Sequence, residues 1–223
     1  MAPAHYGLFR AVIKSTNDTP AALPDIPVYF TKAFWDVPRD HWADGHIHAL
    51  AGVRVTRGCG GGNFCPENTL TRAEMAVTVV RAMYGPDYAP PPAVGIFADV
   101  EISDTNNTAD YIEQLYNDGI VNGCSAGPPV LYCPNDIVNR AQMAKFLALA
   151  FELPILPATG YFTDVTGVHE WAAPYAEALF EAGITLGCGP QIYCPGNNIT
   201  RAELAVMLVR GLGLDTYDHP DGP

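Results

Sequence analysis

The sequence predicts a mainly α protein made of three helix-loop-helix repeats that share a central helix bundle. A cysteine pair followed by an arginine occurs three times, as CGGGNFCPENTLTRAEMA (59–76), CSAGPPVLYCPNDIVNRAQMA (124–144) and CGPQIYCPGNNITRAELA (188–205). Each unit also opens with an aromatic residue and an acid, as FWDV, FADV and FTDV. Because short motifs recurring in one order mark a repeat architecture, the 223 residues are interpreted as one three-unit fold.

The repeats are separated by proline-rich connectors. GPDYAPPPAVG and ELPILPATG hold prolines that cannot continue a helix and favour extended backbone. The predicted organisation is an N-terminal arm (1–32), repeat 1 (33–85), a linker (86–95), repeat 2 (96–151), a linker (152–160), repeat 3 (161–214) and a C-terminal tail (215–223).

A first helix follows each opening motif. WADGHIHALAGVRV (42–55) and WAAPYAEALFEAGI (171–184) place apolar residues at helical spacing. In repeats 2 and 3 this helix closes at Gly119 and Gly183, the residue type that tolerates a left-handed helix cap. Repeat 1 has Arg54 there, so its cap is expected to be built differently.

A second helix has the clearest start signal in the chain. TRAE and its variant NRAQ form capping boxes, in which a Thr or Asn N-cap is followed three residues later by Glu or Gln. Behind each cap an apolar stripe repeats at i, i+3, i+4 and i+7. Three like stripes most simply pack together, which predicts a central bundle with approximate threefold symmetry. The cap pairs are Thr71 with Glu74, Asn139 with Gln142, and Thr200 with Glu203.

The six cysteines form three local pairs, a pattern typical of disulfides in an extracellular protein. Such bridges either staple small units or also fix a ligand-binding loop. Zinc is the third interpretation, but a lone pair supplies two ligands where four are usual, so no metal site is expected. The predicted bridges are Cys59–Cys65, Cys124–Cys133 and Cys188–Cys194.

Composition and charge exclude several function classes. There is no apolar run long enough to span a bilayer, and the N-terminus lacks the features of a secretory signal, which leaves the export route open. The formal charge of -12 disfavours duplex nucleic acid, so any anionic ligand needs local positive charge. No arrangement typical of a catalytic site stands out, and we expect neither enzymatic activity nor a cofactor.

The arginine of each capping motif is the main candidate for ligand binding. Arg72, Arg140 and Arg201 occupy the first helical position, where side chains tilt towards the helix N-terminus and the dipole favours anions. A guanidinium there can hold a carboxylate with two parallel hydrogen bonds. The alternative is that each arginine pairs with a neighbouring acid and ties its unit together.

The order FxDV, WAxxxIxxLxxxGI, G, an aromatic-Pro loop and TRAE resembles the S-layer homology domain, in three tandem copies over about 180 residues. The resemblance implies a three-pronged helical fold that binds bacterial wall glycans, commonly pyruvylated, in grooves between prongs, without catalysis. It implies ligand contacts for the three arginines. The resemblance also implies ligand contacts for Asp36, Asp99, Asp164, Trp42 and Trp171.

This sequence departs from the family pattern in two places. Repeat 2 has Asn107 where the tryptophan is expected and NRAQ in place of TRAE, so the groove that uses Asn107 lacks an aromatic platform for sugar. The paired cysteines stand where the family has no bridge, and they lock the loop covalently.

Two functions follow as hypotheses. The first is a cell-surface or extracellular module that binds carboxylated wall polysaccharide. The second is a structural subunit of an extracellular assembly, such as a surface lattice, a filament or a decoration protein of a virus particle. Residues 1–32 favour the second, because YGLFRAVIKS alternates like a strand and such an arm can pair with another protein subunit. The arm can equally wrap its own repeats.

Overall fold

The computed structural model describes residues 34–103 and 107–216. Within these ranges every regular element is a helix, and β structure is limited to isolated bridges, so the predicted mainly α class is confirmed. The elements are α1 (Asp44–Gly52), α2 (Arg72–Tyr84), α3 (Thr108–Asn117), α4 (Arg140–Ala150), the 3-10 helix η1 (Gly167–Ala172), α5 (Ala173–Glu181) and α6 (Arg201–Gly211).

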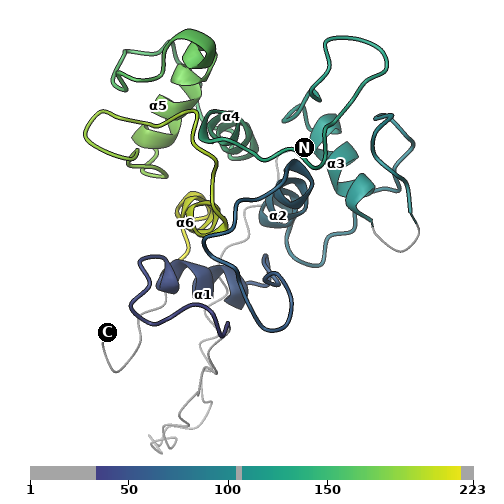
Figure 1. The fold of residues 1–223 in the computed structure, drawn as a ribbon, viewed down its shortest axis with the longest axis horizontal. Helices are drawn as coiled ribbons and strands as arrows, with labels where there is room; N and C mark the ends of the chain where they lie inside the picture. The colour runs from purple at the N-terminus through teal and green to yellow at the C-terminus, as the bar shows by residue number, and fades with distance from the viewer. Residues whose placement is uncertain (1–33, 104–106, 217–223) are drawn as a thin grey trace, which may run out of the picture.

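The second helices of the repeats, α2, α4 and α6, lie at the centre, and α1, α3 and α5 lie around them (Figure 1). Each central helix packs against an outer helix of another repeat: α2 against α3, α4 against α5, and α6 against α1. The lobes of the structure are therefore shifted by one helix from the sequence repeats, and α6 with α1 joins the last repeat to the first. The threefold symmetry itself stays a prediction.

One continuous hydrophobic cluster runs through all three repeats. The stripes predicted on the second helices face it, since Val79, Leu147 and Leu208 are fully buried. The stripe therefore provides the burial that holds three short helices together, which local propensity alone does not achieve for helices of 11 to 13 residues.

All three capping boxes are formed. In each, the side chain of the N-cap accepts from the backbone N–H three residues on, and the side chain of that residue accepts from the N-cap backbone. The arginines occupy the first helical position as predicted.

The cap of the first helix in repeat 1 differs from the sequence-based expectation. Arg54 adopts φ 60°, close to the 74° of Gly119 and the 71° of Gly183. Its N–H donates to Ala51 O and the next N–H, of Val55, donates to Leu50 O, which is the pattern seen at both glycines. The prediction that repeat 1 caps this helix differently was wrong. The two hydrogen bonds that close the helix stabilise the left-handed conformation, which a non-glycine residue adopts at some cost.

The outer helices hold the linkers through buried glutamates. Glu177 accepts hydrogen bonds from the backbone N–H groups of Thr159, Gly160 and Tyr161 at 2.6 to 2.9 Å. Glu113 does the same for residues 94–96. Each carboxylate thereby satisfies three donors of an extended segment that has no sheet partner.

Replacing Glu177 by Gln is expected to make stability less dependent on pH. Burial alone raises the pKa of Glu177, but the hydrogen bonds from Thr159, Tyr161 and Gly160 outweigh it and lower the pKa below 4.5. Because the folded pKa is depressed, the stabilisation is present above pH 4.5 and is lost as pH falls through the folded pKa. Urea unfolding of both proteins from neutral to acidic pH should show their stabilities converging in acid. A constant difference would contradict the assignment.

The predicted strand in residues 1–32 lies outside the described residues. Among the helices described, none has the length and apolar character needed to cross a membrane.

Candidate functional site

The predicted disulfides are formed between Cys59 and Cys65, Cys124 and Cys133, and Cys188 and Cys194. Each closes the loop that leads into a second helix. The loop approaches its own start closely: a Cβ on Gly58, Gly123 or Gly187 would lie 2.1 to 2.4 Å from a carbonyl oxygen of the same loop. Asp36 and Asp99 lie beside two of the bridges, but oxidised cysteines are not thiolate ligands for a metal.

The three motif acids fix these loops. The carboxylate of Asp36 accepts from the backbone N–H of Phe64 at 2.7 Å and of Cys65 at 2.6 Å. Asp99 and Asp164 accept in the same way from the second cysteine of their loops and from the tyrosine before it. Each second cysteine has a positive φ of 57 or 58°, so the acid holds the loop in a conformation that is otherwise unfavourable. Their predicted role as ligand contacts stays a prediction.

The aromatic residue before the second cysteine also joins two repeats. Its carbonyl oxygen accepts a hydrogen bond from Nε of the arginine of the preceding repeat, where repeat 3 counts as preceding repeat 1. The guanidinium of that arginine lies over the aromatic side chain. Arg72 binds Tyr132 O at 2.7 Å, Arg140 binds Tyr193 O at 2.8 Å and Arg201 binds Phe64 O at 2.8 Å. The distances from Cζ to the ring centroids are 4.5, 5.0 and 5.0 Å.

The first backbone donors of the second helices are occupied at the same junctions. The N–H of Arg201 donates to Asn68 O and that of Ala202 to Pro66 O. The equivalent bonds form at α2 and α4. These donors are therefore unavailable to an external anion, and positive charge for a ligand must come from side chains.

The three arginines differ in burial and in partners. Arg72 and Arg140 are each only 4% exposed, whereas Arg201 is partly exposed. Arg140 Nη1 forms an ion pair with Glu203 at 2.8 Å, which realises the predicted pairing with an acid, although not with the acid of the opening motif. Arg72 Nη2 is buried with no hydrogen-bond partner in the described part of the chain. Over the same ranges, Arg201 forms a side-chain hydrogen bond only through Nε.

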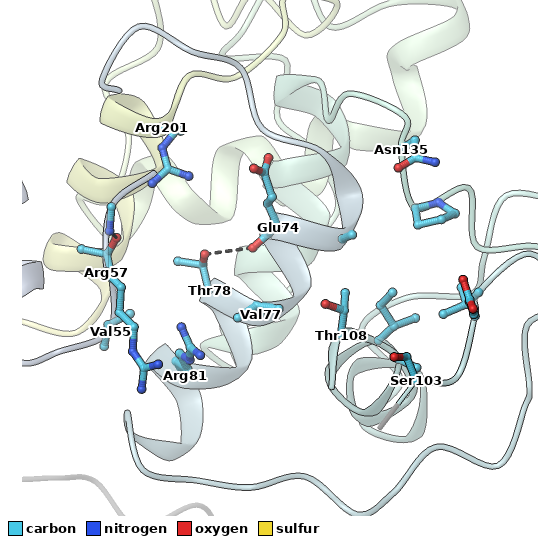
Figure 2. A pocket seen from close by; sticks show the side chains of 18 of the residues that line it. Val55, Arg57, Glu74, Val77, Thr78, Arg81, Ser103, Thr108, Asn135 and Arg201 are labelled. Atoms are coloured by element: carbon cyan, nitrogen blue, oxygen red, sulfur yellow. Dashed lines mark hydrogen bonds between the residues drawn. The ribbon is translucent and has the colours of Figure 1, made fainter. Parts of the chain in front are cut away.

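Arg201 points into a groove of about 780 Å³ (Figure 2). The walls come from α2, from residues 55–58, from residues 99–103 with the start of α3, and from Pro134 and Asn135. Its charged groups are three arginines and three acids: Arg57, Arg81, Arg201, Glu74, Asp99 and Glu101.

Arg201 keeps its charge in the groove although burial disfavours the charged form. Burial lowers the pKa of Arg201, and the charges of Glu74 and Asp36 oppose that shift; the guanidinium stays protonated. Arg81, whose Cζ lies 5.5 Å from the Tyr111 ring centroid, has a buried Nε without a hydrogen-bond partner among the described residues. The sequence analysis did not predict Arg57 and Arg81 as groove residues. The signal in the sequence that could have indicated them was their positive charge, in the loop after α1 and on α2.

The structure separates the predicted tryptophans from the predicted arginine. Trp42 and Trp171 are 60% and 46% exposed, and neither lines the groove of Arg201. That groove is bordered by Ser103 and Thr108, next to Asn107, where the tryptophan is missing. An aromatic platform and a free arginine therefore do not meet in this groove.

Comparison with known proteins gives a specific similarity. Residues 33–76 and 161–205 match the S-layer homology domain. These SLH segments cover the first and third repeats up to the start of α2 and α6, and thus include Arg72 and Arg201.

Several surface proteins and enzymes are similar to the chain over most of its length. The S-layer protein sap of Bacillus anthracis is 32% identical over 184 residues, which is 80% of this chain and 21% of that protein. The amylopullulanase of Thermoanaerobacterium thermosulfurigenes is 29% identical over 185 residues, or 80% of this chain and 9% of the enzyme. The surface-layer 125 kDa protein of Lysinibacillus sphaericus is 29% identical over 175 residues, 76% of this chain and 14% of that protein. The chain thus spans about a fifth or less of these relatives.

Proposed function

We propose that the chain is a non-catalytic cell-surface module that binds a carboxylated, pyruvate-bearing bacterial wall glycan in the groove of Arg201. The observation that carries the proposal is the state of this arginine. It is partly buried, it is fixed through Nε and ring stacking, and its Nη donors have no hydrogen-bond partner in the described ranges. A fixed guanidinium with free Nη donors suits a carboxylate, which it holds with parallel hydrogen bonds.

The balance of charge in the groove favours a glycan over a polyanion. Arg57, Arg81 and Arg201 are offset by three acids, Glu74, Asp99 and Glu101, and the whole chain carries a formal charge of -12. A dense polyanion would be repelled, whereas a sugar polymer has widely spaced carboxylates and many hydroxyl groups that can donate to the acids.

The relatives support attachment rather than catalysis. The segment similar to this chain occupies only 9% of an amylopullulanase and 21% of an S-layer protein. An enzyme and an S-layer protein share this segment, which fits a surface-anchoring module better than a catalytic domain. The acids of the loops also serve the fold: Asp99 binds two backbone N–H groups.

Purified, oxidised protein is expected to sediment with isolated bacterial wall polysaccharide and to lose this binding after mild acid removes the pyruvate ketals. The reason is that the ketal carries the carboxylate that Arg201 would hold. The control is polysaccharide taken through the same steps without acid. Equal binding before and after ketal removal would contradict the carboxylate mechanism. Absence of binding to both would contradict the glycan function and favour the assembly hypothesis, which deletion of residues 1–30 then tests.

A further inference from the structure

One position on the second helices carries a side chain of different size in each repeat. It lies six residues after each arginine and is occupied by Thr78, Phe146 and Met207. In α4 the Phe146 ring centroid lies 5.7 Å from Cζ of Arg72, the arginine of the preceding repeat, which is 4% exposed. In α2 the same position is Thr78, on the wall of the groove into which Arg201 points (Figure 2).

We propose that Thr78 keeps one groove open while Phe146 and Met207 close the other two, so that each chain holds one glycan site. Thr78 is small, and its hydroxyl donates to Glu74 O, which ties the hydroxyl to its own helix. In α6 this position is Met207, which is 4% exposed. Arg140, the arginine of the preceding repeat, is equally buried. This inference rests on the proposed function for the identity of the ligand, but the exposure of the arginines is independent of it.

The two closed grooves differ in a way that makes only one of them a latent site. Arg140 is neutralised by Glu203 at 2.8 Å, so removal of Met207 would expose a guanidinium that is already paired. Gln142 replaces that glutamate in α4, and Arg72 Nη2 has no hydrogen-bond partner within the described ranges. Opening the Arg72 groove would therefore present an unpaired donor to a carboxylate.

The first test uses no glycan. Phenylglyoxal labels accessible arginines, and peptide mass spectrometry of the oxidised protein gives the rate for each site. A buried group reacts only after local opening, so Arg201 should react at least about 10-fold faster than Arg72 or Arg140. Thr78→Phe should slow Arg201 to the rate of Arg72, and the matched control Thr78→Val should not. Unchanged labelling of Arg201 in Thr78→Phe would overturn the proposal.

The second test counts sites with a methyl glycoside that bears a pyruvate ketal, by titration calorimetry. The wild type should bind one molecule per chain, Thr78→Phe none, and Phe146→Thr two, if circular dichroism shows that this core variant folds. Met207→Thr should stay at one. Two or more sites in the wild type would overturn the proposal. If labelling follows the prediction while neither the wild type nor any variant binds the probe, the proposed function is wrong. The control of Arg201 exposure by residue 78 is then still supported.

Discussion

Arg140→Ala is expected to lower the free energy of unfolding by about 3 to 5 kcal/mol, because a charged hydrogen bond, a half-buried ion pair and a cation–π contact are lost together. Arg140 is 4% exposed and connects two repeats. Its removal leaves Glu203 without its ion-pair partner and Tyr193 O without its Nε donor, and it uncovers the Tyr193 ring. Urea unfolding of the oxidised protein measures the change.

Two further variants separate charge from packing. Arg39→Ala removes an exposed arginine and should change stability by no more than about 0.5 kcal/mol. Arg140→Met combined with Glu203→Gln removes both charges and keeps the capping box, as Gln142 does in α4, so it should recover part of the loss. A loss for Arg140→Ala as small as that for Arg39→Ala would show that the junction does not stabilise the fold.

Arg201→Ala is expected to weaken binding of the ketal-bearing glycan by about 30- to 1000-fold, which corresponds to roughly 2 to 4 kcal/mol for a partly desolvated charged contact. Stability should fall far less than in Arg140→Ala, since Arg201 has no acid as ion-pair partner within the described ranges and is partly exposed. Affinity is measured by titration calorimetry, with Arg39→Ala as the control of equal charge. Unchanged affinity in a folded Arg201→Ala protein would contradict the site.

The helix starts, the buried helix faces and the disulfide pairs could be predicted from the sequence, because each depends on residues that lie close together in the chain. A Thr or Asn with Glu or Gln three residues later determines where α2, α4 and α6 begin, and apolar spacing determines which face of each is buried. Cysteines six to nine positions apart in short loops pair with one another. Arg54 is the exception, because a left-handed cap depends on the bonds that close the helix as well as on residue type.

The packing of the helices and the inequality of the arginines were not predictable from any single repeat. Each central helix packs on the outer helix of another repeat, a choice that like repeats leave open. Arg72, Arg140 and Arg201 stand at the same position of their capping motifs, yet their surroundings come from other repeats: Phe146 beside Arg72, Glu203 beside Arg140, and an open groove beside Arg201. The difference lies in contacts across repeats.

The most direct test of the carboxylate site is a side-chain ¹⁵N NMR spectrum recorded during titration with the ketal-bearing glycoside. Arginine Nε–H and tryptophan indole N–H signals report the competing surfaces in one sample. The Arg201 signal is expected to shift and saturate while those of Arg72 and Arg140 stay fixed. Arg201 lines the groove and has Nη donors without a partner in the described ranges, whereas Arg72 and Arg140 are buried. Saturable shifts at the Trp42 or Trp171 indole with an unmoved Arg201 signal would contradict the account.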